Sequence, residues 1–322
     1  MAEHESTGDT LWVASAGGHL EQARMLSTRI GMAGGVWVTY DVPQASSLLD
    51  GEEVLYAHHP TTKNIGNALR NYRLARRIFR ERAISRVVST GAAVAVPFMV
   101  RARQLGLPCH YIESATRVAG PSLSGRMLQA VPGVRLYRQM GTWGRGKWRP
   151  GPCVFDGFQA SAAGADVDAV ALRGVVVSLG THEFPFPTLV ERLCEELPKG
   201  VDDLTWQLGS TRDPGDLPGT VVSQLPSQDL KEAIRAADVL IGHCGVGLAL
   251  TALTVGKVPV MVPRRRRRRE HTDDHQVELA RELDRRGLAV VTEAGELRRE
   301  HLERAAGLVA TWHKPPAFDL VD

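Results

Sequence analysis

The sequence predicts an α/β protein made of two domains, each built on a parallel sheet. Short apolar runs alternate with amphipathic helical patterns along the chain, as expected for strands joined by crossover helices. The 322 residues exceed the usual length of one domain. In each half, a strand-like run also ends in a glycine-rich junction that precedes a helical pattern.

Five apolar runs predict the strands of the first half, at residues 10–15, 36–40, 86–90, 108–112 and 133–137. Residues 65–82 predict a helix between two of them, because apolar side chains recur at helical spacing while arginines occupy the other faces. The apolar side chains of this pattern are Ile65, Ala68, Leu69, Tyr72, Ala75 and Phe79.

The second half repeats the pattern, with strands predicted at residues 174–179, 203–207, 238–242, 258–262 and 288–292. The stretch "ASAAGADVDAVALRG" (160–174) is rich in Ala, Gly and Asp without a clear period, which is typical of a linker. We therefore expect domains at residues 1–160 and 161–322.

The composition is that of a globular protein, with 43% hydrophobic and 23% charged residues. The longest apolar run, "GAAVAVPFMV" (91–100), is far shorter than a membrane-spanning helix, and the polar first ten residues do not resemble a signal peptide. The four cysteines have no paired spacing, so we expect buried thiols in a cytoplasmic protein. They are Cys109, Cys153, Cys194 and Cys244.

The charge is distributed unevenly. Between residues 57 and 155 the chain carries 17 Lys and Arg but only two Asp and Glu. Such an excess favours an anionic partner, which could be a phosphate group, a membrane surface or nucleic acid, although a solvated basic face would give the same count. The glycine-rich strand ends argue against nucleic acid.

In the first half the junction is "LWVASAGGHLEQ" (11–22), where a strand meets a helix at Gly17, Gly18 and His19. Ligands of parallel sheets bind at the carboxyl ends of strands, where helix N-termini offer unpaired N–H groups. Glycine also lets a ligand approach the backbone closely. The same residues could instead form a simple tight turn, since the full dinucleotide-binding pattern is absent.

The second half contains a counterpart in "ADVLIGHCGVGLALTALTVGKVPVMVP" (237–263). A buried strand, a loop with His243, Gly245 and Gly247, a helix and a second strand form one βαβ unit. Another loop, Gly180-Thr181-His182, follows the strand "GVVVSL". Both loops are expected at the carboxyl edge of the second sheet, where they could face an anion.

Longer motifs make a family resemblance specific. "ASAGGHLEQ", "VVSTGAAVAVPF", "YIESATR", "SLSGR" and "FDGF" resemble the acceptor-side subunit of bacterial exopolysaccharide glycosyltransferases and of the dolichol-pathway N-acetylglucosaminyltransferase. "VVVSLGTHEFPFPTLVERL", "AADVLIGHCGVG", "GKVPVMVPR" and "EHTDDHQVELA" are similar to the donor-side subunit, a MurG-like family 28 glycosyltransferase domain. The resemblance covers residues 10–295, with both halves fused in one chain.

This resemblance implies a GT-B fold, in which two Rossmann-like domains face each other across a cleft. It further implies inverting transfer of a hexosyl group from a UDP-sugar to a polyprenyl-diphosphate-linked acceptor. His19 would be the catalytic base or would orient the acceptor; an imidazole with a reference pKa near 6.5 suits that role. Glu113 is the rival base, or else a carboxylate that caps the next helix. Gly17, Gly18 and Arg117 would contact the acceptor or its phosphates.

On the donor side, the resemblance assigns Gly180, Thr181, Gly245 and Gly247 to the phosphates, and His275 and Gln276 to the sugar. His243 would be either a donor contact or a structural histidine. Related enzymes carry a glutamate that holds the ribose where this chain has Thr251, whose shorter, uncharged side chain cannot bridge two hydroxyls. Nucleotide binding through this position is therefore in question.

Two further motifs have alternative interpretations. "HTDDH" (271–275) has the spacing of metal ligands, but a fourth ligand is not evident, so we expect no metal and instead a helix cap at Asp273 or Asp274. No cofactor is expected besides the sugar nucleotide. The run Arg264–Arg269 is either a solvated loop or a phosphate contact.

The helix 65–82 and the loop 135–151 combine arginines with aromatic side chains, which suits an anionic membrane interface. The aromatics of that loop, Tyr137, Trp143 and Trp148, could instead pack on their own domain. We thus expect a peripheral, cytoplasmic enzyme at the inner face of the membrane. There are two alternatives. The enzyme could transfer the sugar to a soluble small molecule, or the protein could be a non-catalytic subunit that binds a sugar nucleotide.

Overall fold

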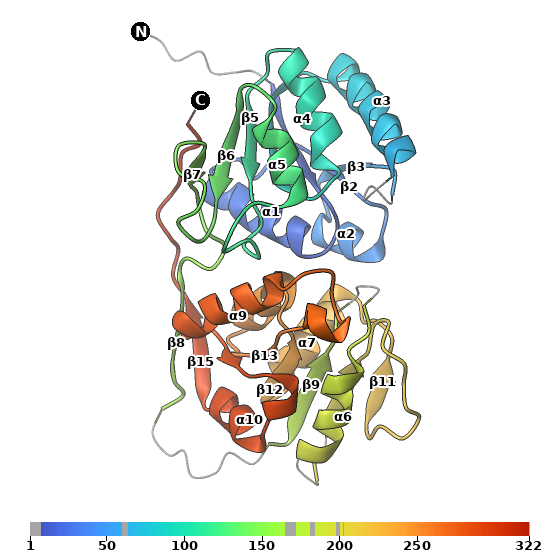
Figure 1. The fold of residues 1–322 in the computed structure, drawn as a ribbon, viewed down its shortest axis with the longest axis vertical. Coiled ribbons are helices and arrows are strands. Elements are labelled where there is room, and N and C mark those ends of the chain that lie inside the picture. Colours follow the sequence, from blue (N-terminus) through green and yellow to red (C-terminus); the bar gives the residue numbers. More distant parts are fainter. Residues whose placement is uncertain are drawn as a thin grey trace. The chain divides into compact units, whose positions relative to one another are not determined.

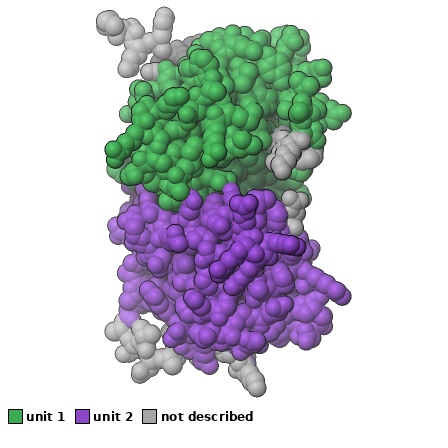
Figure 2. Space-filling view, in the orientation of Figure 1, with its two compact units in different colours: residues 1–154, 315–322 green, residues 155–314 purple. Residues whose placement is uncertain are grey.

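The structure is a computed structural model that describes residues 8–59, 64–164, 172–180, 184–197, 200–201 and 203–321. It forms two compact units, one of residues 1–154 with 315–322 and one of residues 155–314 (Figure 2). The sequence analysis does not foresee that the C-terminal segment packs with the first unit. Of the expected linker, residues 165–171 lie outside the described residues, and the segment before them belongs to a strand.

The first unit contains a seven-stranded parallel sheet in the order β3-β2-β1-β4-β5-β6-β7 (Figure 1). Its strands are β1 (Asp9–Ala14), β2 (Val36–Thr39), β3 (Glu53–Tyr56), β4 (Ile84–Gly91), β5 (Cys109–Ile112), β6 (Val134–Arg138) and β7 (Trp148–Pro150). The strand order reverses between β1 and β4, so the loops after these two strands diverge and leave room for a ligand.

Five helices connect these strands, namely α1 (Gly18–Arg29), α2 (Pro43–Leu48), α3 (Ile65–Glu81), α4 (Ala95–Gln104) and α5 (Leu123–Gln129). Right-handed crossovers place α1 and α2 on one face of the sheet and α3, α4 and α5 on the other. The last three lie side by side in Figure 1. They cover a continuous core that includes Leu11, Val38, Phe98 and Leu136.

Helix α3 forms as predicted but buries a different face. The sequence pattern places Ile65 and Leu69 on the core side, yet both are exposed, at 79% and 53%. The helix buries Asn67, Asn71, Leu74, Ala75 and Ile78, of which only Ala75 belongs to the predicted pattern. Asn71 is held by the backbone of His58, accepting its N–H at 2.8 Å and donating to its carbonyl at 3.0 Å. This polar anchor rotates the apolar residues of the first turns toward solvent.

The second unit contains a six-stranded parallel sheet in the order β11-β10-β9-β12-β13-β14. Its strands are β9 (Gly174–Ser178), β10 (Asp203–Gln207), β11 (Thr220–Val222), β12 (Val239–His243), β13 (Val260–Val262) and β14 (Val290–Val291). The strand order again reverses, here between β9 and β12. Both parallel sheets confirm the predicted α/β class.

The helices of this unit are α6 (Pro187–Glu196), α7 (Ser227–Ala236), α8 (Val246–Thr254), α9 (His275–Arg285) and α10 (Arg299–Ala306), with 3₁₀ turns at Arg266–Arg268 and Ala294–Glu296. A separate antiparallel ribbon pairs β8 (Phe158–Ala162) with β15 (Leu308–Trp312). The sequence analysis misses β3, β7, β8, β11 and β15; of these, β7 and β11 are only three residues long.

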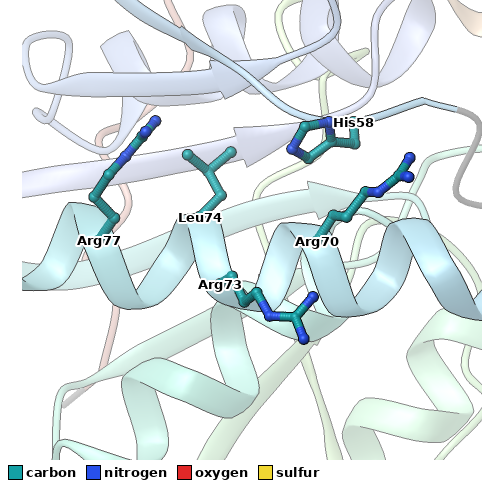
Figure 3. A pocket seen from close by; sticks show the side chains of 5 residues that line it. All are labelled: His58, Arg70, Arg73, Leu74 and Arg77. Atoms are coloured by element: carbon teal, nitrogen blue, oxygen red, sulfur yellow. The ribbon is translucent and has the colours of Figure 1, made fainter.

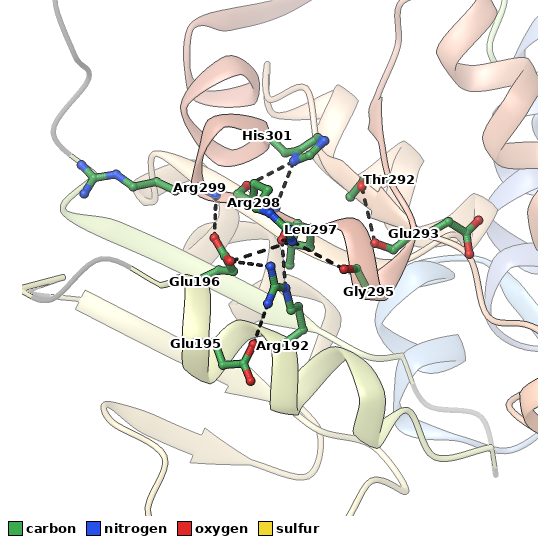
Figure 4. A network of polar contacts seen from close by, with 10 residues as sticks. All are labelled: Arg192, Glu195, Glu196, Thr292, Glu293, Gly295, Leu297, Arg298, Arg299 and His301. Atoms are coloured by element: carbon green, nitrogen blue, oxygen red, sulfur yellow. Dashed lines mark hydrogen bonds and ion pairs between the residues drawn. The ribbon is translucent and has the colours of Figure 1, made fainter.

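A polar network fastens α6 to the segment before α10 (Figure 4). Arg192 donates from Nε to the carbonyl of Leu297 at 3.0 Å and from Nη1 to Glu195 at 2.6 Å. Glu196 accepts the backbone N–H of Arg299 at 3.2 Å. These contacts satisfy groups at helix ends, so the outer helices of this unit are held by hydrogen bonds as well as by the core.

The expectation for the thiols is wrong at one position. Cys109, Cys153 and Cys244 are buried, but Cys194 on α6 is exposed. Burial raises the pKa of the Cys109 thiol to about 12, so this cysteine stays protonated at neutral pH.

The close approach of β1 and β2 predicts a large cost for one substitution. Gly35 has a φ of +122°, and a Cβ there would lie 2.3 Å from the carbonyl oxygen of Thr10. We expect Gly35→Ala to destabilise the protein by about 2–4 kcal/mol in thermal or urea unfolding. The control Gly31→Ala, with φ +74° and nothing within 4 Å, should cost only about 1 kcal/mol. Equal losses in the two variants would contradict the steric argument.

Candidate functional site

The first unit places His19 in the first turn of α1, beside the end of the neighbouring strand β4. Nδ1 of His19 lies 2.8 Å from the carbonyl oxygen of Thr90, and Thr90 Oγ1 donates to the carbonyl of His19 at 2.6 Å. A Cβ at Gly91 would approach the imidazole to 3.0 Å. The ring is thus held against the backbone of β4, and it is half-buried.

This contact determines which ring nitrogen can act as a base. A carbonyl oxygen only accepts, so Nδ1 of His19 must carry the proton. In the neutral ring the lone pair is then on Nε2, the arrangement of a general base that is oriented by its other nitrogen. The geometry is compatible with the expected catalytic role of His19, which remains a prediction.

Gly17 begins α1 with a φ of 79° and ψ of −145°, a conformation that favours glycine. Its carbonyl accepts the N–H groups of Leu20 and Glu21. Within the described residues, neither Gly17 at the start of α1 nor Gly245 at the start of α8 provides a side-chain cap. The first-turn N–H groups of both helices therefore suit an anionic ligand.

A buried network beneath this turn was not found from the sequence. The amide of Gln22, on α1, donates to Gly18 O at 2.9 Å, while its oxygen accepts from Ala115 N at 2.9 Å and from Gln139 at 2.8 Å. Gln139 also donates to the carbonyl of Glu113 at 3.0 Å. The two glutamines tie the first turn of α1 to the ends of β5 and β6. The stretch "GGHLEQ" could have indicated the first of these contacts, because its last residue, Gln22, lies one helical turn after Gly18.

Glu113 follows β5 and is 1% exposed. One carboxylate oxygen accepts from Ser114 N at 3.0 Å and from Tyr111 Oη at 3.2 Å; the other accepts both N–H and O–H of Ser122 at 2.9 Å. Ser122 is the N-cap of α5. This geometry favours the helix-capping alternative over a base that reaches substrate. Burial raises the pKa of Glu113, although these hydrogen bonds oppose the rise.

Arg117 lies in the same loop, half-buried, and its positive charge lowers the pKa of Glu113. Its backbone carbonyl accepts from Trp143 Nε1 at 3.1 Å. Arg117 follows β5 and so lies toward the carboxyl edge of the first sheet, where Gly17, Gly18 and His19 follow β1. Its contact with an acceptor stays a prediction.

In the second unit, His243 ends β12 and its ring fills the space between two glycine backbones. A Cβ at Gly180 would lie 2.5 Å from Cε1 of His243, and one at Gly245 would lie 2.4 Å from its Nε2. Gly180 also has a φ of +79°. Any side chain at either glycine would displace the imidazole, so the packing itself accounts for both glycines. Thr181 and His182, from the same predicted loop, lie outside the described residues.

The helix after this loop carries Gly247 and Thr251. The hydroxyl of Thr251 donates to the carbonyl of Gly247 at 2.9 Å, one turn earlier. Because the hydroxyl proton of Thr251 is engaged within α8, this side chain is poorly suited to hold the ribose in place of the glutamate of related enzymes.

Gln276, in the first turn of α9, is buried, and its side-chain oxygen accepts the backbone N–H of Arg264 at 3.0 Å. Arg264 in turn donates from Nη2 to the carbonyl of Leu179 at 2.7 Å. Leu179 directly precedes Gly180. These contacts bring the loops after β9, β12 and β13 together with the start of α9. Most of the donor-side residues predicted from sequence are therefore neighbours.

His275 precedes Gln276 and forms a close contact through Nδ1 with the carboxylate of Asp273. His271, Asp273 and His275 are the described residues that could hold a metal ion, with ligand atoms within 4.8 Å of one another. The expected cap is only partly present: Asp274 occupies the N-cap position without a side-chain cap bond, and Asp273 accepts from His275 N at 3.4 Å. Asp274 instead accepts from Arg266 N at 3.0 Å.

The loop 135–151 does not offer the aromatic surface expected at a membrane. Tyr137 and Trp148 are buried, and Trp143 packs edge-on against Trp148 with centroids 4.9 Å apart. Trp148 also donates to Gln129 at 2.8 Å. Trp148, with Trp143 against it, belongs to the core that also includes Leu128 of α5, whereas Tyr137 packs against His110 and Phe318. The alternative of packing on their own unit is therefore correct. Among the described helices, none has both the length and the apolar character needed to cross a bilayer.

Residues 194–306 match the glycosyltransferase family 28 C-terminal domain. This match spans β12, α8, β13 and α9, which supply most of the donor-side cluster. Among curated proteins, none matches the chain.

Solved structures share the architecture of the whole chain. MurG from Acinetobacter baumannii has 17% identity and a TM-score of 0.55, over 92% of this chain and 89% of its own. SnogD, a glycosyltransferase from Streptomyces nogalater, has 19% identity and a TM-score of 0.57 over the same shares. UGT89C1 from Arabidopsis thaliana, solved with UDP-L-rhamnose, has 12% identity and a TM-score of 0.54, over 94% and 90%.

The chain is a glycosyltransferase with the GT-B fold. The structural likeness supplies the fold, and the family 28 match supplies the class of enzyme. Both confirm what the motifs "AADVLIGHCGVG" and "EHTDDHQVELA" indicate.

The raised pKa of Glu113 predicts a pH dependence of stability. The folded protein holds this proton to a higher pH than the unfolded chain, whose carboxyl titrates near 4.5. Folding therefore takes up a proton in that interval, and stability falls as the pH rises from 4.5 through the raised pKa. In Glu113→Gln this part of the pH dependence should disappear from thermal unfolding curves. An identical slope in wild type and variant would contradict the assignment.

Proposed function

We propose that this enzyme transfers a hexosyl group, with inversion, from a UDP-sugar to a polyprenyl-diphosphate-linked acceptor used in cell-surface polysaccharide synthesis. The convergence of His243, Gly245 and Gln276, which lie within the region matched by the family 28 domain, with Gly180, which precedes that region, carries the proposal. UGT89C1, a structural neighbour, was solved with a UDP-sugar, which supports the choice of nucleotide. The order of an acceptor-side half and a donor-side half supports a fusion of the two subunit types.

Each half has its own chemical task. In the first unit, Nε2 of His19 would accept the proton of the attacking acceptor hydroxyl as the bond to the anomeric carbon forms. In the second, the N–H of Gly247, with the loops at Gly180 and Gly245, would stabilise the UDP that leaves. The N–H of Gly245 itself donates to the carbonyl of His243 at 2.8 Å. Thr181, His243 and His275 complete the proposed donor contacts, with Gln276 on the sugar hydroxyls. Catalysis by helix dipoles and basic groups needs no metal ion, so we propose that none is required.

The substitution His19→Ala tests the proposal. We expect transfer from a UDP-sugar to fall by about 10²-fold or more, because the base is lost, while UDP still raises the melting temperature. Transfer should be measured with and without EDTA, to test whether a metal ion is required. The control variant is His313→Ala, at an exposed position of the second unit.

Each unfavourable outcome selects an alternative. Indifference of the wild type to UDP, dTDP and GDP would reject a sugar-nucleotide enzyme. UDP binding without transfer in the wild type would favour a non-catalytic subunit, for which the Thr251 substitution is the best argument. Equal transfer to soluble and lipid-linked acceptors would favour a small-molecule substrate.

The layer of helices α3, α4 and α5 suits a membrane surface better than the loop 135–151. Exposed apolar side chains lie in the first turns of α3 and α5, at Ile65, Leu69, Leu123 and Met127. Helices of a parallel sheet all begin at the same edge, so both groups lie toward the edge where the acceptor would bind. Apolar side chains beside cations are typical of peripheral membrane contacts.

A basic pocket of about 300 Å³ adjoins this surface (Figure 3). His58, Arg70, Arg73, Leu74 and Arg77 line it. The ion pairs of the described residues include none of these arginines, so their charge is available for anionic headgroups. This supports a peripheral location at the cytoplasmic face of a membrane.

Vesicle binding tests the membrane contact. A double variant Ile65→Ser/Leu69→Ser should bind anionic phospholipid vesicles about tenfold more weakly in co-sedimentation, because two apolar side chains no longer enter the interface. The control Val309→Ser/Trp312→Ser removes exposed apolar side chains from the second unit and should bind like wild type. Vesicle binding that is unchanged in the first variant would reject this surface.

A further inference from the structure

Arg264 differs from the five arginines that follow it. It lies two residues beyond β13 and is 1% exposed, whereas Arg266, Arg267, Arg268 and Arg269 are exposed. Its guanidinium lies 5.3 Å from the centroid of the Phe186 ring. The first arginine of the run is therefore part of the interior of the second unit.

The guanidinium of Arg264 is only partly satisfied. Nη2 donates to Leu179 O, while Nε and Nη1 have no hydrogen-bond partner among the described residues. The carboxylate of Glu270 attracts the guanidinium electrostatically, but its oxygens accept from Thr188 Oγ1 and from the backbone N–H of Arg265 instead of from the side chain of Arg264. Burial lowers the pKa of Arg264 to about 10, so the group remains charged at neutral pH. A buried cation with two unsatisfied N–H groups is costly, and proteins ordinarily avoid it.

The position of this charge relates it to the donor loops. The side chain holds the carbonyl of Leu179, next to Gly180, and the backbone N–H holds the oxygen of Gln276. Arg264 thereby fixes which end of the Gln276 amide can donate to a ligand. Both contacts end at residues expected to meet the sugar nucleotide.

We propose that Arg264 is a positioning residue of the donor site, whose partly compensated charge is balanced when the diphosphate of the sugar nucleotide binds. This inference rests on the proposed function and extends it to a residue that the family resemblance does not assign. Because the side chain is buried, it acts through the carbonyl of Leu179 and through its electrostatic potential, not by direct contact. The contact with Gln276 comes from the backbone N–H of Arg264 and does not depend on the side chain. A dianionic ligand near a buried cation gains attraction that water would otherwise screen.

The proposal predicts opposite effects on stability and on binding. In Arg264→Met the apoprotein should melt at or above the wild-type temperature, because two buried N–H groups without hydrogen-bond partners are gone. The Kd for UDP, measured by calorimetry, should rise by about 10–100-fold, and the Kd for UMP should rise less. Arg264→Lys keeps the charge and should stay within about threefold of wild type for UDP. Arg304→Met, at an exposed position on α10, is the control and should match wild type.

The outcomes separate this inference from the proposed function. If wild-type protein binds no UDP, the proposed function fails whatever Arg264 does. If wild type binds UDP and Arg264→Met binds it equally well, the inference is overturned. A lower melting temperature together with weaker binding in Arg264→Met would show a merely structural role and would also overturn it. If Arg264→Met does not fold, weak UDP binding by Arg264→Lys would overturn the inference instead.

Discussion

In both units, the geometry of the candidate site depends on an imidazole packed against a glycine at the end of a neighbouring strand. His19, after β1, lies against Gly91 of β4; His243, at the end of β12, lies against Gly180 after β9. In each case the two strands are those between which the strand order reverses. A Cβ at Gly180 would overlap the ring of His243, and one at Gly91 would crowd the ring of His19, so each histidine depends on its glycine. This contact restricts the conformations that the loops around each pair can adopt.

The surroundings of the two candidate sites satisfy their buried polar groups differently. Around His19, Gln22, Gln139 and Glu113 form a network in which side-chain oxygens and amides meet backbone partners. Such a network holds the first turn of α1 in one arrangement. In the second unit, Arg264 keeps two N–H groups without partners among the described residues. The two glutamines and Glu113 are thus satisfied within their network, whereas the guanidinium of Arg264 is not fully satisfied.

The basic character of the first unit also has a structural explanation. Its arginines lie largely on the outer side of α3 and nearby helices, while the aromatic side chains of the loop 135–151 enter the core. Asn71 turns α3 so that Ile65 and Leu69 are exposed beside Arg70 and Arg73. One buried asparagine therefore decides whether this helix presents a purely cationic surface or an amphipathic one.

The sequence by itself determined the α/β class, ten of the strands and the loops that form the site. Strong apolar runs and glycine-rich strand ends are local signals, and carboxyl ends of parallel strands necessarily meet at one edge of a sheet. Local signals did not reveal short strands such as β7 and β11 or the buried face of α3, and they left open whether Trp148 is buried and whether Glu113 caps a helix. Only the tertiary structure decided these features, because each depends on a partner distant in sequence. Gln139 reaches Gln22 across 117 residues and Arg264 reaches Leu179 across 85, and no periodicity within either segment encodes such a contact.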